Sequence, residues 1–568
     1  MGEYTLSTSK ARPAWQELAR NHRGQQHSNI PKEWLISDEL LTELGCRTAG
    51  IDLVKAKVVA KTGLLSEGEL EITEAYTAVE LLEKMAAGHL TSLQVTTAFC
   101  KRAALAQQVT NCLTEIFFAD ALQRAADLDA HYNSTSSVKG PLHGLPISLK
   151  DALIVSGKYA TVGYTEFLRH PPPTKESALV SQLLDAGAVL YCKTNIPQTM
   201  MSADSENNVF GRTVNPRNIA LTAGGSTGGE AALLALRGSP LGVGSDIAGS
   251  IRIPSLCCGT YGFKPTADRV PPSGQSDSPF HRLYIPGVVP PVTGPMANSV
   301  EDLEAFMRIV STQSPWKYDH AAIHAPWTAT NLQTSPRPLR IGVLPEDTEY
   351  TIHPPVKRAL NEACALLRDA GHTLIPLAED PTRSIGLGAR LAFYSYGIGS
   401  PSHQEFMAKL GEPLVMSIGR GVHPFTNHPP LAPGTDDVGE KLDKFAVARD
   451  QYSDSWRRTW VQHDLDVVLA PGAQSTAVPH DQYGVPAYTC AWNVPDFPAC
   501  IIPFGAASKE RDPDAVFATA AFDPDYDPEA LDGAPCAVQI IAPRFHDELC
   551  LSATKIIDAV LNPGKPTR

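Results

Sequence analysis

The chain has 568 residues, of which 48 are basic and 61 acidic, so its formal net charge is −13. A chain this acidic lacks the positive surface that phosphate backbones require, and we expect no nucleic-acid partner. No apolar stretch is long enough for a helix that spans a membrane. Residues 1–29 are polar and charged, without the apolar segment of a secretory signal. We therefore expect a cytoplasmic protein with no membrane span.

The eleven cysteines are irregularly spaced and include no Cys-x-x-Cys pair. Zinc sites need clustered ligands, and a disulfide framework is unusual in a chain of this length. Most of these cysteines lie in apolar segments, so the pattern predicts buried free thiols.

In chain order, the first predicted unit is an N-terminal extension over residues 1–70. This stretch is polar and irregular, with one short helix expected at 15–23, and we interpret it as a segment that wraps a larger body. Apolar residues at helical spacing then predict a helix over 73–88. Thr91 and Gln94 form a capping box for the helix that follows.

Beyond this point, short apolar runs alternate with helical segments. We predict strands at 145–149, 188–192, 241–243, 339–344, 465–469, 499–502 and 538–541, and helices at 120–131, 177–186, 230–236, 356–370 and 547–560. Such alternation indicates an α/β fold with a mixed, twisted central sheet covered by helices. We expect one large domain over residues 71–562, with the N-terminal extension packed outside it.

Proline-rich stretches interrupt this pattern. We interpret 171–173, 286–295 and 423–433 as surface loops. Apolar periodicity also fades over 401–442, and we expect a variable excursion at the substrate entrance, at about residues 390–440.

The densest chemical signal is a pair of glycine-rich turns that flank one helix. The first reads Gly-Gly-Ser-Thr-Gly-Gly at 224–229, and the second reads Asp-Ile-Ala-Gly-Ser-Ile-Arg at 246–252. Glycines let a backbone approach its ligand closely, and exposed N–H groups at such turns and at a helix N-terminus favour negative charge.

Three interpretations of the first turn compete. A phosphate loop requires a lysine after the last glycine, whereas Glu230 follows here and would repel a phosphate. Residues 224–228 fit the Gly-x-Ser-x-Gly elbow of α/β-hydrolases, but 218–223 is only a weak strand, and that class needs Asp and His partners. The third interpretation needs a base that is not a histidine. Apart from these three, the turn could be a glycine-rich packing turn with incidental serines.

Lys150 offers a base that is not a histidine, because it ends the apolar strand at 145–149. Burial disfavours a charged amine and lowers its pKa. A neutral amine can take a proton from a serine hydroxyl. The alternative is a lysine that reaches the surface with its amine and pairs with Asp151.

Lys150 and both turns together resemble the amidase signature family. Ser250 follows Ser226 by 24 residues and Lys150 precedes Ser226 by 76, which are spacings typical of that family. The resemblance covers about residues 70–560. Other segments similar to the family are Leu142-His143-Gly144-Leu145-Pro146, Lys193-Thr194-Asn195-Ile196-Pro197-Gln198 and 488–498. The N-terminal extension and residues 211–218 most resemble the fungal acetamidase or general amidase branch.

The resemblance implies a Ser-Ser-Lys triad. In it, Ser250 is the nucleophile that forms an acyl-enzyme, Ser226 is the serine that relays the proton, and Lys150 is the general base. In the family the relaying serine follows a cis peptide bond, which here would join Gly225 and Ser226.

The resemblance also implies how substrate is bound. Met200 would line the acyl pocket, and Thr227 would support the hydrogen-bond network around the serines. The N–H groups of the nucleophile loop would form the oxyanion hole. The implied substrate-binding residues are Met200, Ser226, Thr227, Ile247, Ala248, Gly249 and Ser250.

Two features of the second turn need separate interpretation. We predict that Asp246 and Arg252 form a structural ion pair, because buried charges are rarely unpaired. Family members usually have Gly-Gly-Ser at the nucleophile, whereas this chain has Ala248 before Gly249. An alanine strains the loop only where φ is positive. We expect Ala248 to lie in an ordinary region of φ and ψ.

The resulting hypothesis is an amidase that splits a linear carboxamide into a carboxylate and ammonia or an amine. No metal or organic cofactor is implied, the partner is a small-molecule amide, and a homodimer is possible. Two alternatives stay open: a catalytically weak binding protein with the same fold, and a transamidating subunit that passes ammonia to another protein.

Overall fold

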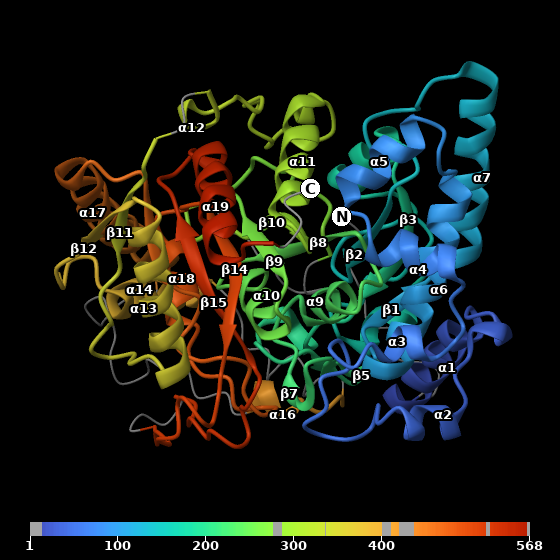
Figure 1. Cartoon of the computed structure of the whole chain (residues 1–568), viewed down its shortest axis with the longest axis horizontal. Coiled ribbons are helices and arrows are strands. Elements are labelled where there is room, and N and C mark those ends of the chain that lie inside the picture. Colours follow the sequence, from blue (N-terminus) through green and yellow to red (C-terminus); the bar gives the residue numbers. More distant parts are fainter. Residues whose placement is uncertain are drawn as a thin grey trace.

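The computed structural model describes residues 14–276, 287–334, 337–399, 411–419, 437–518 and 523–564. Its centre is an 11-stranded sheet with the strand order β1-β3-β2-β8-β10-β9-β14-β15-β13-β11-β12. In Figure 1 the N-terminal part of the chain, in blue and teal, and the C-terminal part, in yellow to red, lie on opposite sides of the central green strands. The sheet therefore joins both halves of the sequence.

The strands of this sheet are β1 (Leu113–Ile116), β2 (Pro146–Lys150), β3 (Val189–Thr194), β8 (Leu241–Asp246), β9 (Tyr261–Lys264), β10 (Val292–Ala297), β11 (Arg340–Val343), β12 (Thr373–Pro376), β13 (Val467–Pro471), β14 (Ala499–Ala506) and β15 (Pro535–Ile541). Two small hairpins pair β4 (Glu206–Asn207) with β5 (Gly211–Arg212) and β6 (Val214–Asn215) with β7 (Asn218–Thr222).

The helices are α1 (Trp15–Ser28), α2 (Asp38–Glu43), α3 (Val58–Lys61), α4 (Glu67–Glu74), α5 (Ala78–Ala86), α6 (Ser92–Thr110), α7 (Phe118–Thr135), α8 (Ala178–Asp185), α9 (Gly228–Ala235), α10 (Arg252–Cys258), α11 (Val300–Thr312), α12 (Asn331–Thr334), α13 (Pro354–Asp369), α14 (Ile385–Gly397), α16 (Met416–Gly419), α17 (Val438–His463), α18 (Ala487–Asn493) and α19 (Asp547–Leu561). Short 3₁₀ turns lie at Lys32–Trp34, Thr165–Arg169, Gln198–Met200 and Pro315–Lys317.

The predicted fold class is confirmed, since the central sheet is mixed. β2 runs parallel to β3 and β8, whereas β8, β10, β9, β14 and β15 form antiparallel pairs in turn. Each strand and helix predicted between 73 and 560 is present, with ends that differ by a few residues. The capping box of α6 is also confirmed: the Thr91 hydroxyl accepts from the Gln94 N–H at 3.0 Å, and the Gln94 side chain accepts from the Thr91 N–H at 2.9 Å.

The N-terminal extension is more helical than predicted. The helix expected at 15–23 is α1, but α2, α3 and α4 follow it before residue 75. These helices are 6, 4 and 8 residues long, too short for an apolar period to show. α4 crosses the boundary placed at residue 70, and a hydrophobic cluster joins side chains on both sides of it. The division into 1–70 and 71–562 stays a prediction.

The prediction of a loop at 286–295 is wrong for its last residues, because β10 begins at Val292 and includes Pro295. Pro295 pairs with Val243 of β8, while the ladder with β9 reaches only Met296 and Ala297. On the β9 side, therefore, Pro295 has no ladder hydrogen bond to lose, which lets a strand contain it. Residues 171–173 lie outside helices and strands, as predicted. The loop at 423–433 and most of the excursion at 390–440 lie outside the described residues.

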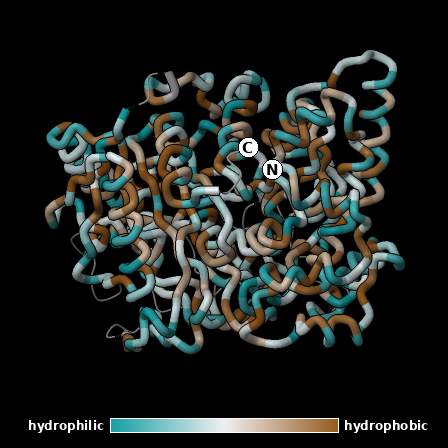
Figure 2. The backbone as a smooth tube through the Cα atoms, in the orientation of Figure 1, coloured by the Kyte–Doolittle hydropathy of each residue, from teal (hydrophilic) through white to brown (hydrophobic). Residues whose placement is uncertain are grey.

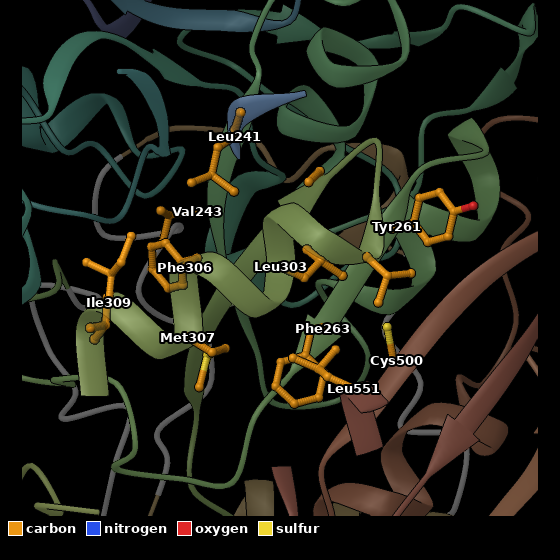
Figure 3. Close-up of a cluster of buried hydrophobic side chains, with 14 of the residues drawn as sticks. Leu241, Val243, Tyr261, Phe263, Leu303, Phe306, Met307, Ile309, Cys500 and Leu551 are labelled. Atoms are coloured by element: carbon orange, nitrogen blue, oxygen red, sulfur yellow. The ribbon is translucent and has the colours of Figure 1, made fainter. Parts of the chain in front are cut away.

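The core is distributed along the whole chain. Figure 2 shows hydrophobic segments in both halves of the molecule rather than in one block. In Figure 3, apolar side chains of α11 face those of β8 and β9; the labelled residues are Leu241, Val243, Tyr261, Phe263, Leu303, Phe306, Met307, Ile309, Cys500 and Leu551. The cysteines are free thiols and all but Cys364 are buried, as predicted. Within the described ranges, no helix is both long and apolar enough to cross a membrane.

Candidate active site

Parallel pairing of β2 and β8 brings the lysine and the second glycine-rich turn to one edge of the sheet. Leu149 lies opposite Val243 in this ladder, so Lys150 ends its strand beside the end of β8. The turn with Ser250 begins directly after β8, and Ser226 lies just before α9, which packs on β2 and β8. Carboxyl ends of parallel strands are where ligands bind in α/β sheets.

Lys150 is buried, with 1% of its surface exposed, and its amine contacts two serines. Nζ lies 2.7 Å from Ser226 Oγ and 2.9 Å from Ser245 Oγ, and it donates to the Ser245 carbonyl at 3.3 Å. Burial lowers the pKa of Lys150 to about 7, against the opposing influence of Asp246 and Asp151. Near neutral pH a large fraction of this amine is therefore uncharged and can accept a proton.

The two serines predicted to react are both buried. Ser226 is 2% exposed and Ser250 is 8% exposed, so Ser250 is the more exposed of the two. Among the described residues, no hydrogen bond joins the two hydroxyls directly. The Gly225–Ser226 peptide bond is cis, as the resemblance to the amidase signature family implies. A Cβ on Gly225 would lie 2.3 Å from the Ser202 carbonyl oxygen, so only glycine fits there.

The predicted ion pair of Asp246 and Arg252 is confirmed. Arg252 donates from Nε and Nη2 to the two carboxylate oxygens of Asp246 at 3.0 and 2.9 Å, and both side chains are fully buried. Arg252, Asn493 and nearby cations hold the pKa of Asp246 well below its usual range, against the effect of burial. The same carboxylate accepts the N–H groups of Gly249 and Ile251 at 2.9 and 3.1 Å. Asp246 thus stays ionised and holds the loop that carries Ser250 through two of its N–H groups.

The four N–H groups of the predicted oxyanion hole are not equivalent. The Gly249 N–H is already engaged by Asp246, whereas those of Ile247, Ala248 and Ser250 form no hydrogen bond with the described residues. Gly249 has φ of +124°, and Ala248 is outside the positive-φ region, as predicted. An alanine therefore fits at 248 without backbone strain.

The two remaining predicted residues, Thr227 and Met200, have different surroundings. The Thr227 hydroxyl donates to the Ser245 carbonyl at 3.4 Å, which is the same oxygen that Lys150 contacts. Met200 is partly buried in a small apolar cluster separate from the main core, with Val162, Tyr164, Phe167 and Leu414. Leu414 belongs to the described part of the predicted excursion, so this segment contacts the predicted acyl-pocket residue.

Sequence reasoning missed three hydroxyl groups near this centre. Ser245 is adjacent to the second turn, and its position at the end of β8 could have pointed to it. Tyr396 in α14 donates to the Ile247 carbonyl at 2.5 Å, and Thr489 in α18 donates to the Ala248 carbonyl at 2.7 Å. Thr489 lies in the family-like segment 488–498, which could have pointed to it, whereas Tyr396 belongs to no motif, and no local signal indicates it.

Within the part of the chain that the structure describes, no group of three or more His, Cys, Asp or Glu side chains could hold a metal ion.

Comparison with known proteins gives one consistent result. A family profile described as Amidase matches residues 94–551. An amidase of Gibberella moniliformis is 39% identical over 96% of this chain and 98% of its own length. An acetamidase of Emericella nidulans is 37% identical over 96% of this chain and 98% of its own length.

A solved structure of a fatty acid amide hydrolase superposes with a TM-score of 0.83. It is 31% identical, and the match covers 97% of this chain and 95% of that one. These matches extend over nearly the whole described fold, including the sheet edge that carries Lys150 and both serines. The chain therefore belongs to the amidase family, as its motifs indicate, and is an enzyme that hydrolyses amides.

Proposed function

We propose that the enzyme cleaves a linear carboxamide through an acyl-enzyme on Ser250, with Ser226 as the proton relay and Lys150 as the base. The observation that carries the proposal is the buried amine of Lys150, 2.7 Å from the Ser226 hydroxyl and with its pKa lowered to about 7. A neutral amine so placed can take the proton of Ser226 while Ser226 takes that of Ser250.

Attack by Ser250 on the amide carbonyl makes a tetrahedral intermediate with a negative oxygen. The unengaged N–H groups of Ile247, Ala248 and Ser250 would stabilise this charge. The proton then passes back through Ser226 to the departing nitrogen, which leaves as ammonia or an amine. Water attacks the acyl-enzyme by the same relay and releases the carboxylate.

The substrate we propose is an amide with a small or hydrophobic acyl group. Met200 and its apolar neighbours would contact the acyl chain. The relatives named acetamidase and fatty acid amide hydrolase are likewise named for carboxamides. A cytoplasmic location and a homodimer stay predictions from sequence.

The test uses purified protein, a panel of primary amides with increasing acyl length, and ammonia release as the readout. Wild-type enzyme should turn over part of the panel, and Ser250→Ala should retain less than about 1% of that rate, because covalent catalysis carries the reaction. The variant should keep the wild-type melting temperature, since a hydroxyl in a turn adds little stability. Substantial turnover by folded Ser250→Ala would refute Ser250 as the nucleophile.

The same preparations separate the alternatives. A fluorophosphonate should label wild-type protein at Ser250 and leave Ser250→Ala unlabelled; failure to label would favour a binding protein that has lost turnover. Ammonia release by the chain alone would exclude a transamidating subunit, which works only with its partner. An inactive chain that gains activity with a partner would favour that alternative.

A further inference from the structure

Three successive carbonyls in the loop that carries the nucleophile, those of Ile247, Ala248 and Gly249, have hydrogen-bond partners. The Ile247 carbonyl accepts from Tyr396 and the Ala248 carbonyl from Thr489, at 2.5 and 2.7 Å. The Gly249 carbonyl accepts from the Ile253 N–H at 2.7 Å. Three successive peptide groups are therefore held at their oxygen atoms.

Holding a carbonyl also sets the direction of the next N–H. These peptide bonds are trans and planar, so the C=O of one residue and the N–H of the following residue point in opposite directions. Tyr396 therefore sets the direction of the Ala248 N–H, which points away from α14. The peptide group of Ala248 and Gly249 is held twice, by Thr489 at its oxygen and by Asp246 at its N–H. By contrast, among the described residues the Ala248 N–H has no partner, and there Tyr396 makes the hydrogen bond that fixes its peptide group.

Helix packing around Tyr396 restricts the position of its side chain. α14 packs against α18, which carries Thr489, and a Cβ on Gly388 of α14 would lie 2.7 Å from the Ala491 Cβ of α18. The Tyr396 ring also makes an edge contact with Phe393 one turn earlier, at a centroid distance of 5.5 Å. Burial raises the pKa of the Tyr396 hydroxyl well above its ordinary value, so this group remains a donor throughout the neutral range.

We propose that Tyr396 is a positioning residue, whose hydroxyl holds the Ile247 carbonyl so that the Ala248 N–H faces the developing oxyanion. The inference rests on the proposed function, because an oxyanion forms only if Ser250 attacks a carbonyl. It assigns a role in transition-state stabilisation to a residue more than a hundred positions from either glycine-rich turn.

The test compares Tyr396→Phe with wild type on the best primary amide. Loss of a whole oxyanion donor lowers kcat by about 100- to 1,000-fold in other hydrolases. In Tyr396→Phe the Ala248 N–H is misdirected rather than absent, so kcat should fall by about 10- to 100-fold. KM should stay within about twofold, because the uncharged ground state needs this N–H less than the transition state does. The acid limb of the pH profile should not move, since Lys150 is untouched.

The matched control is Tyr191→Phe. Tyr191 is buried, whereas Tyr396 is partly buried, and the Tyr191 hydroxyl donates to the Gly238 carbonyl at 2.6 Å, outside the loop of the nucleophile. Both variants lose one tyrosine-to-carbonyl hydrogen bond, and the melting temperature of Tyr191→Phe should fall at least as far as that of Tyr396→Phe, while only Tyr396→Phe should lose kcat. Thr489→Val provides a second comparison: its peptide group keeps the bond to Asp246, so its loss in kcat should be smaller.

The outcomes separate the inference from the proposed function. If wild type hydrolyses amides, Ser250→Ala does not, and folded Tyr396→Phe has a wild-type kcat, the role of Tyr396 is refuted and the mechanism stands. A rise in KM with unchanged kcat would also refute it, and would place Tyr396 in substrate binding. If wild type and Ser250→Ala are equally inactive on the whole panel, the proposed function itself fails. Should Tyr396→Phe not fold, a kcat loss in Thr489→Val that Thr489→Ser restores would support oriented peptide groups, and wild-type kcat in Thr489→Val would contradict them.

Discussion

Turnover should depend on pH through the ionisation of Lys150. Its pKa falls from 10.5 to about 7 because the amine is buried. At pH 7.5 roughly three quarters of such amines are neutral, against about one in a thousand for an ordinary lysine. Burial therefore raises the population of usable base several hundred-fold. Below pH 7 the neutral fraction, and with it kcat/KM, should fall about tenfold for each pH unit.

The assay is a profile of kcat/KM from pH 5 to pH 9 for wild type, Lys150→Ala and Lys150→Arg. Both variants should lose most of the activity. An arginine side chain cannot give up its proton in this range, so Lys150→Arg should fail despite its positive charge. Residual activity in Lys150→Ala should show no acid limb near pH 7. Because Lys150 and Ser226 serve one proton path, the double variant should be little worse than the poorer single variant.

A stability measurement controls for misfolding and tests the same pKa independently. The folded state holds Lys150 with a lowered pKa, so the cost of burying its charge is complete below about pH 7 and disappears as the pH rises towards 10.5. Lys150→Met should therefore melt higher than wild type at pH 6, and this advantage should shrink above pH 7. A Lys150→Arg enzyme with a near-normal rate and the wild-type acid limb would refute the lysine base.

Two further predictions concern the nucleophile loop. Arg252→Met should lower the free energy of unfolding by about 3–5 kcal/mol in a denaturant titration, because it leaves Asp246 buried without its partner; a loss below about 1 kcal/mol would contradict this. Ala248→Gly should leave kcat within about twofold, since Ala248 already has ordinary backbone angles, and should cost about 0.5–1 kcal/mol through the entropy of the unfolded chain. A large gain in kcat would show that the alanine does distort the oxyanion hole.

Local patterns predicted the parts of this structure that local forces determine. The capping box of α6 depends on two residues three positions apart, and both predicted hydrogen bonds are present. Strands β2 and β8 are short apolar runs, and a parallel ladder between them is enough to bring Lys150 to the second turn. The motifs therefore indicated correctly that Lys150 and Ser226, two residues of the proposed triad, lie close together.

Other features could not be derived in this way. α2 and α3 have 6 and 4 residues, so their apolar residues show no period. Pro295 is found in a strand because the ladder between β10 and β9 includes only Met296 and Ala297, which is a property of the strand pairing and not of the proline. Whether Ala248 strains the loop depended on its φ, which no residue pattern reveals.

The contacts that would orient the loop around Ser250 could not be predicted from sequence motifs either. A reacting side chain must have a particular chemistry at a particular place, and glycines around it must leave room for the substrate, so the two turns stand out in the sequence. An orienting group needs only one hydroxyl directed at one carbonyl, and any helix that packs beside the loop can provide it. Tyr396 and Thr489 come from α14 and α18, far along the chain from Ser250. If Tyr396→Phe loses kcat as proposed, part of the transition-state stabilisation resides in helix packing that the motif does not contain. Relatives that share both turns could then differ in rate because their equivalents of α14 differ.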